Sequence, residues 1–137
     1  MHFEETLDFE GDPEEVWRRA SNVAEIPRYW HGTRSIEAVG AEGGKVHVKV
    51  EFAFGGRGEA DIVTDEAGRT VTIEYRSGPF TGRQTVAVSG RRLVATWDVR
   101  FRGFFRLASR WNEGHFRSGT RHALERLAAG APRGEKV

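Results

Sequence analysis

Apolar and polar positions alternate through the middle of this chain. The segment KVHVKVEFAF places Val46 and Val48 on one face and His47 and Lys49 on the other. An alternation with a period of two residues predicts β-strands that bury one face and expose the other. The pattern returns in four later segments, which are residues 58–65, 69–78, 82–90 and 93–101. Short turns rich in glycine separate these segments, so we expect consecutive strands to pair antiparallel.

Helix signals stand on both sides of this run of strands. Before it, the segment GDPEEVWRRA offers Asp12 as an N-cap and Pro13 at the first helical position, followed by two glutamates. A second short helical segment follows, with Asn22 as its cap and Pro27 interrupting it. After the strands, residues 105–129 predict one long helix.

The order of elements is one strand at residues 3–9, two short helices, about six strands from residue 33 onward, and the long helix. A sheet with one apolar face needs a covering layer, and only the last helix is long enough to supply it. We therefore predict an α+β fold in which a curved antiparallel sheet of about seven strands surrounds the C-terminal helix. Residues 1–130 would form this domain, and residues 131–137 a polar tail.

Composition places the chain among soluble globular proteins. Its 137 residues are 38% hydrophobic and 30% charged. No apolar run approaches the roughly 20 residues of a membrane span, and the N-terminus lacks the features of a signal peptide. The absence of cysteine excludes disulfides, thiolate metal ligands and thiol nucleophiles. We therefore predict a cytoplasmic protein without stable membrane insertion.

Charge is unevenly distributed along the chain. The net charge of +1 gives little attraction to nucleic acid, so we predict no nucleic-acid partner. Residues 1–25 nevertheless hold eight acidic residues, and residues 100–126 hold seven arginines. These segments either lie side by side and neutralise each other, or form a basic face for an anionic ligand or lipid headgroup. Only three of the 21 basic residues are lysine, which is compatible with a thermophilic source and equally with a GC-rich genome.

The stretch DPEEVWRRASNVAEIPRYWHG lies between the first two predicted strands. It begins with the pattern Pro13-x-x-Val16-Trp17. Pro27 and Trp30 follow in its second half. With this stretch, the chain resembles the START-like helix-grip superfamily, also called SRPBCC. Members include polyketide cyclase/dehydrase-like, pollen-allergen-like and coenzyme Q-binding proteins, and relatives of a small carbon monoxide dehydrogenase protein. The layout of elements resembles this superfamily over nearly the whole chain, whereas the specific residues are confined to this stretch.

The resemblance implies a helix-grip fold with a cavity between the sheet and the long helix. Such a cavity takes an apolar or amphiphilic small molecule, such as a fatty acid, isoprenoid, quinone, sterol or polyketide. The superfamily shares no catalytic signature, so the resemblance assigns no catalytic residue to this chain. We predict no cofactor.

Titratable side chains offer few signs of catalysis. His115 and His122 share a helix face but stand about 10 Å apart along its axis, too far for one metal ion. We therefore predict no metal site. His31 and His115 are candidates for general acid–base work. Glu74 and Asp98 lie opposite the apolar stripes, where a solvated ladder of ion pairs is expected.

Aromatic side chains give the strongest sign of a ligand. Large rings around an incompletely filled centre are typical of apolar pockets, although any one ring can equally belong to the core. The helical segment RWNEGHFRSGTRHAL adds two glycines, each unfavourable in a helix by about 1 kcal/mol, which would leave room beneath the helix. We predict that the ligand-binding residues are Trp30, Phe52, Phe54, Tyr75, Phe80, Trp97, Trp111, Asn112, His115, Phe116 and Gly119.

Three functions are compatible with these observations. The first, which we favour, is binding and carrying an apolar or amphiphilic small molecule, whose polar end would meet Arg110, His115 or Arg117. The second is an enzyme of polyketide cyclase or dehydratase type, with His115 or His31 as its acid–base group. The third is a protein-interaction module that uses the fold without a ligand.

Overall fold

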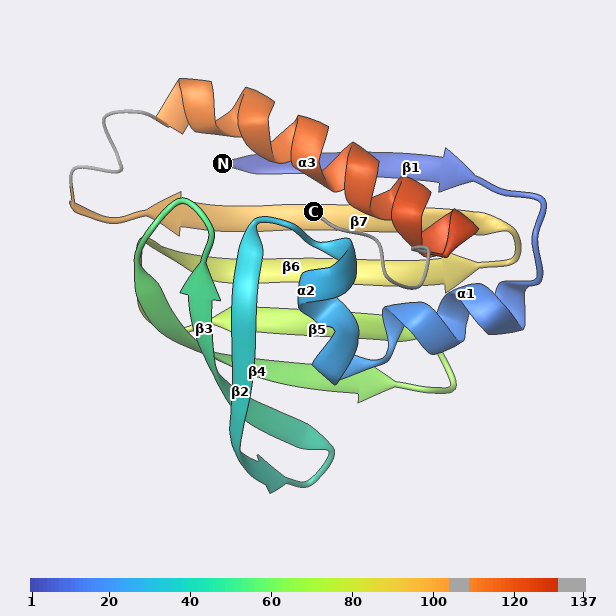
Figure 1. The fold of residues 1–137 in the computed structure, drawn as a ribbon, viewed down its shortest axis with the longest axis horizontal. Helices are drawn as coiled ribbons and strands as arrows, with labels where there is room; N and C mark the ends of the chain where they lie inside the picture. Colours follow the sequence, from blue (N-terminus) through green and yellow to red (C-terminus); the bar gives the residue numbers. More distant parts are fainter. Residues whose placement is uncertain (104–108, 131–137) are drawn as a thin grey trace.

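The computed structural model describes residues 1–103 and 109–130, with the side chains of residues 109–112 outside the description (Figure 1). Its elements are β1 (His2–Asp8), α1 (Pro13–Ala20), η1 (Val23–Glu25), α2 (Ile26–Tyr29), β2 (Thr33–Glu42), β3 (Lys45–Phe52), β4 (Arg57–Asp65), β5 (Thr70–Tyr75), β6 (Phe80–Ser89), β7 (Arg92–Phe101) and α3 (Ser109–Ala129). They confirm the predicted α+β helix-grip fold. The predicted tail and the predicted helix start at residues 105–108 lie outside the described residues.

The seven strands form one antiparallel sheet in the order β1-β7-β6-β5-β4-β3-β2. Strands β2 to β7 follow one another as a meander, and β1 pairs with β7 at the far edge. In Figure 1, β2 and β3 run across the direction of β5, β6 and β7, so the sheet is strongly curved. Register shifts in the β2–β3 pair, between Thr33 and Ser35 and between Ala38 and Gly40, add local bends.

The core lies between the concave face of this sheet and α3, which crosses over β1 and β7. Along β7, the buried residues Leu93, Ala95 and Trp97 alternate with more accessible ones. From the helix, Leu124 and Leu127 are each 1% exposed. Burial of such a side chain contributes about 1.5–3 kcal/mol. The burial pattern of β7 therefore follows the alternation that the sequence shows.

The helix α1 begins as the sequence predicts, whereas the next segment does not. The Asp12 carboxylate accepts a hydrogen bond from the backbone N–H of Glu14 at 3.0 Å, and Pro13 takes the first helical position. The predicted cap at Asn22 is wrong, because its side chain makes no capping hydrogen bond. Pro27 does not interrupt a helix either. It lies in the first turn of α2, where a residue without an N–H loses no helical hydrogen bond.

The acidic N-terminal segment and the basic C-terminal segment meet at β1 and α3. Arg117 Nη1 lies 2.9 Å from Glu5 Oε2, and Arg121 Nη2 lies 3.3 Å from Glu5 Oε1. The Arg117 guanidinium also stands over the Phe3 ring, 4.8 Å from its centroid. These contacts confirm that the two segments neutralise each other here.

The outer face of the sheet carries the ladder of ion pairs that the alternation predicts. Arg83 lies 3.4 Å from Glu74 on the neighbouring strand, and Arg57 lies 3.6 Å from Glu51. Exposed pairs of this kind contribute only about 0–1 kcal/mol each. The ladder therefore supports solubility and strand register more than overall stability.

Asp61 of β4 is a buried carboxylate on this outer face, with only 3% of its surface exposed. His47 Nδ1 and Arg76 Nε are both hydrogen-bonded to it. Burial alone raises the pKa of the Asp61 carboxyl. The hydrogen bonds and charges of His47 and Arg76 together outweigh burial and hold this pKa below its usual 3.8. The ionised carboxylate is therefore the form that stabilises the fold.

Replacing Asp61 by asparagine is expected to lower the free energy of unfolding by about 1–2 kcal/mol at pH 7, because two hydrogen bonds to a charged acceptor are weakened. The wild-type carboxylate contributes fully above about pH 4, and its contribution is lost as the pH falls through the lowered folded-state pKa. The difference between Asp61→Asn and wild type should therefore shrink between about pH 4 and about pH 2. Urea unfolding across this range measures it.

Asp98→Asn is the matched control, because Asp98 is an exposed carboxylate on the same face. We expect this replacement to change stability by less than about 0.5 kcal/mol. A loss for Asp61→Asn that is equally large at both ends of the pH range would contradict the role of the ionised carboxylate.

Candidate functional site

A cavity of about 440 Å³ lies between the concave face of the sheet and α3. Strands β3, β5, β6 and β7 contribute inward-facing side chains to it, and the segment that follows α2 closes one side. The structure places nine of the eleven predicted ligand-binding residues along this cavity: Trp30, Phe52, Phe54, Tyr75, Phe80, Trp97, His115, Phe116 and Gly119. The side chains of the other two, Trp111 and Asn112, lie outside the described residues.

Aromatic rings from four strands form the floor of the cavity. The ring of Phe80, which is 1% exposed, lies 5.1 Å from the ring of Phe52 and 4.8 Å from that of Tyr75. The ring of Trp97 lies 6.1 Å from that of Phe80. The rings converge because alternate residues of neighbouring strands point to the same face. Each such aromatic pair contributes about 0.5–1.5 kcal/mol beyond burial, so the floor is rigid.

The helix α3 covers this floor with one ring and one glycine. The Phe116 ring meets the Trp97 ring edge-on at 5.1 Å and the Phe80 ring at 5.6 Å. Three residues later, a Cβ atom added to Gly119 would meet no heavy atom within 4 Å. The glycine therefore leaves open space beside the helix, at a position that lines the cavity.

Exposure increases from the floor of the cavity to its mouth. At the mouth, His115 and His122 are exposed, and Phe54 is 43% exposed. The sequence pattern places Phe54 on a strand with Phe52, but β3 ends at Phe52. The chain turns there, because the backbone N–H of Gly55 donates to the Phe52 carbonyl at 3.1 Å. Phe54 consequently stacks on the Phe52 ring at 5.5 Å, at the rim of the cavity.

Sequence reasoning missed two polar residues that line the cavity, Gln84 and Thr120, which are 3% and 2% exposed. Tyr75 Oη donates a hydrogen bond to Gln84 Oε1 at 3.0 Å. Trp97 Nε1 donates to Thr120 Oγ1 at 2.9 Å. Gln84 could have been found from the sequence, because it breaks the apolar stripe of β6 two residues before Val86. Thr120 carries no comparable signal.

The floor of the cavity is electrically neutral. Burial raises the pKa of the Tyr75 phenol far above its usual 10.0, so its hydroxyl stays protonated and remains a donor. Among the described residues, the basic side chains that line the cavity are all half-buried or exposed: His31, His115, His122 and Arg126. The cavity thus combines an apolar, neutral floor with a basic mouth.

Of the three groups expected to meet a ligand's polar end, only one is observed in the cavity lining. His115 lies at the mouth. Arg117 instead pairs with Glu5 on β1, which directs its guanidinium to another surface. The side chain of Arg110 lies outside the described residues.

Metal sites and membrane spans are both absent from residues 1–103 and 109–130. No three histidine, aspartate or glutamate side chains of this part of the chain lie close enough together to hold a metal ion. None of its helices combines the length and the apolar character that crossing a bilayer requires.

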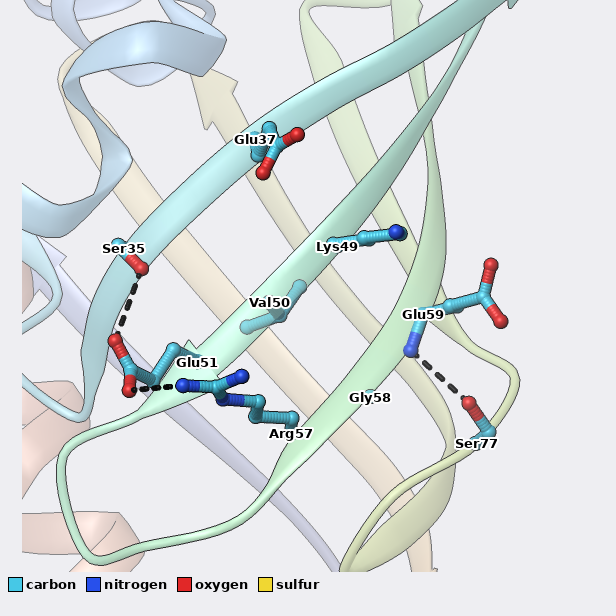
Figure 2. A pocket seen from close by; sticks show the side chains of 9 residues that line it. All are labelled: Ser35, Glu37, Lys49, Val50, Glu51, Arg57, Gly58, Glu59 and Ser77. Carbon is cyan, nitrogen blue, oxygen red and sulfur yellow. Dashed lines mark hydrogen bonds and ion pairs between the residues drawn. The ribbon is translucent and has the colours of Figure 1, made fainter.

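A second hollow of about 500 Å³ lies on the outer face of β2, β3 and β4 (Figure 2). Its polar groups are engaged with one another across the strands. Ser35 Oγ donates to Glu51 at 3.3 Å, and Arg57 lies 3.6 Å from the same carboxylate. The backbone N–H of Glu59 donates to Ser77 Oγ at 3.0 Å. Because this hollow is open and polar, the inner cavity is the candidate site.

The chain matches the model of the family described as polyketide cyclase / dehydrase and lipid transport, over residues 1–131. No curated protein matches its sequence. Among solved structures, TTHA0849 from Thermus thermophilus is similar with a TM-score of 0.76 and 17% identity, over 96% of this chain and 100% of that one.

Two further solved structures are similar. The Zhui aromatase/cyclase from Streptomyces sp. R1128 has a TM-score of 0.60 and 16% identity, over 96% of this chain and 99% of that one. A START superfamily protein from Mycobacterium smegmatis has a TM-score of 0.65 and 13% identity, over 92% and 98%. At these identities the likeness shows a shared fold.

Proposed function

This chain belongs to the polyketide cyclase / dehydrase and lipid transport family, and on that premise we propose that it binds an apolar or amphiphilic small molecule between its sheet and α3. A fatty acid, an isoprenoid and a quinone are the ligand classes that we put forward. The observation that carries the proposal is the cavity of about 440 Å³ with its aromatic floor. Sites for small molecules are typically concave and mostly apolar, with volumes of about 300–1,000 Å³.

The construction of the cavity supports this function. Its floor holds its shape through ring contacts, and Gly119 keeps the helix side open at a cost in helix stability of about 1 kcal/mol. A position that served only packing would favour a larger residue here. Small basic groups at the mouth suit the polar end of an amphiphile.

Native mass spectrometry of the purified protein, together with thermal unfolding, tests the proposal. A ligand present at 100 times its dissociation constant stabilises the folded state by about 2.7 kcal/mol, which raises the midpoint by several degrees. We expect such a shift with at least one class among fatty acids, isoprenoid alcohols and quinones. The absence of any copurified molecule, combined with no shift for any of these classes, would contradict the proposal.

The second candidate is an enzyme of cyclase or dehydratase type, because His31 and His115 both line the cavity. His31 Nε2 is hydrogen-bonded to the Arg28 carbonyl at 3.2 Å, which orients its ring. Both histidines belong to the mouth, whereas the groups on the floor are neutral. This separation supports binding over proton transfer to a deeply held substrate.

Replacing both histidines by asparagine distinguishes the two functions. If the protein is a binder, the double variant His31→Asn/His115→Asn should retain bound ligand, and wild type should release the molecule unchanged. Loss of water from the bound molecule in wild type, but not in the double variant, would support the dehydratase instead.

A protein-interaction module is the function that the surface supports least. Among the described residues, three large apolar side chains are markedly exposed: Val39, Phe54 and Val63. Phe54 belongs to the mouth of the cavity, and Val39 and Val63 lie on strands that β3 separates. Single exposed apolar residues are ordinary on soluble proteins.

A further inference from the structure

Gln84 is a deeply buried side chain with incomplete hydrogen bonding. It is 3% exposed and lines the cavity from β6. Its Oε1 accepts the hydrogen bond from Tyr75 Oη, but no atom of the described residues accepts one from its Nε2. Native structures pair most buried polar groups, so an unpaired buried amide calls for a functional explanation.

The orientation of this amide follows from the donors and acceptors around it. The reversed amide would pair Nε2 with the Tyr75 phenol oxygen. It would then leave the phenol O–H and Gln84 Oε1 both without partners among the described residues. The observed orientation leaves only Nε2 incomplete. The amide therefore presents a donor, and not an acceptor.

The surroundings of this donor are apolar. In the sheet, Gln84 stands opposite Ile73 on β5 and Trp97 on β7. Both neighbours are buried and direct apolar surface to the concave side. Among the described residues, Nε2 is thus the one unpaired donor on the floor, and it is far more deeply buried than the basic groups of the mouth.

We propose that Gln84 selects the ligand by donating a hydrogen bond from Nε2 to a neutral carbonyl oxygen, as in a ketone, quinone or ester, at the buried end of an otherwise apolar molecule. This inference rests on the proposed function. A carboxylate at the floor would be buried without a cation among the described lining residues, which is strongly unfavourable. A pure hydrocarbon would leave the donor unpaired, and a hydroxyl group would add a donor that needs its own acceptor. A carbonyl only accepts, so it matches Nε2.

The pair 2-acetylnaphthalene and 2-ethylnaphthalene tests the proposal. The two compounds share a ring system and nearly a shape, and they differ by a carbonyl oxygen in place of two hydrogens. Dissociation constants of both are measured by ligand-observed NMR, for wild type and for Gln84→Met. The ratio of the two constants is then compared between the proteins, which cancels the difference in hydration between the compounds. We expect the relative preference for the ketone to fall about tenfold in Gln84→Met.

Two further variants control for structural effects. Gln84→Met removes the acceptor of the Tyr75 hydroxyl, so the double variant Tyr75→Phe/Gln84→Met removes both polar groups and leaves no buried partner unpaired. It should show the same loss of preference, and it decides the test if the single variant does not fold. Thr85→Val changes the next residue of β6, which faces outward, and should leave the ratio unchanged.

The outcomes separate this inference from the proposed function. A loss of ketone preference in both Gln84 variants, with no loss in Thr85→Val, supports the role of Nε2. A ratio that stays unchanged in the folded Gln84 variants overturns it, while binding of both compounds leaves the proposed function intact. If wild type binds neither compound, the cavity does not accept apolar molecules of this size, and both proposals fail.

Discussion

Replacing Gly82 by alanine is expected to lower the free energy of unfolding by about 3–5 kcal/mol, through combined backbone strain and overpacking. Gly82 lies in β6 with a φ of 131°, which side chains with a Cβ rarely adopt. A Cβ there would stand 2.2 Å from the carbonyl oxygen of Asp98 and 2.7 Å from the Cα of Val99. Both atoms belong to the backbone of β7, which pairs with β6 in the middle of the sheet. The clash therefore cannot be relieved by turning a side chain.

Gly90→Ala is the matched control, measured by urea unfolding in parallel. Gly90 also has a positive φ, 58°, but a Cβ there would meet no heavy atom within 4 Å. Alanine at this turn carries only the cost of the left-handed backbone, about 1–2 kcal/mol. Equal losses in the two variants would show that strand–strand contact at Gly82 has no part in the effect.

Replacing Gly119 by phenylalanine is expected to weaken ligand binding about 30-fold, which corresponds to about 2 kcal/mol. Gly119 lines the cavity together with Phe116 and His122 on the same face of α3, and the space beside it is open. A phenylalanine there would occupy volume that we assign to the ligand. Titration of 2-acetylnaphthalene into wild type and variant measures the change. Stability should rise by a few tenths of a kcal/mol, because phenylalanine has a higher helix propensity than glycine.

Gly114→Phe separates cavity filling from the general effect of a larger residue in the helix. Gly114 lies in the same helix, is exposed, and has no heavy atom within 4 Å of an added Cβ. It does not line the cavity. Its replacement should give the same gain in helix propensity and leave binding unchanged. Equal affinity of wild type and Gly119→Phe would place the ligand outside this cavity.

Much of the architecture could be predicted because its signals are local. The Asp12-Pro13 pair begins α1 through contacts within one turn, and the alternation along β7 follows from the geometry of an extended chain. Such signals depend on residues adjacent in sequence, so they survive without knowledge of the fold. They fail where a turn is set by a backbone hydrogen bond, as after Phe52, which places Phe54 at the rim.

The cavity itself was predictable only in part. Inward-facing rings can be read from the strands, and a curved sheet brings such rings together whatever their exact register. Gln84 was overlooked, because a single glutamine in a strand is more often solvated than buried. Asp61 was overlooked for the related reason that its burial depends on His47 and Arg76, which belong to other strands or follow them.

The amino-acid pattern was thus sufficient for the elements, for the face that each strand buries, and for the aromatic character of the site. Tertiary structure alone decided which groups meet. The pairs Tyr75–Gln84, Trp97–Thr120 and Glu5–Arg117 join residues that are 9, 23 and 112 positions apart. The physical reason is that periodicity and capping depend on neighbours along the chain. Hydrogen-bond partners depend instead on strand register and on the position where α3 crosses the curved sheet.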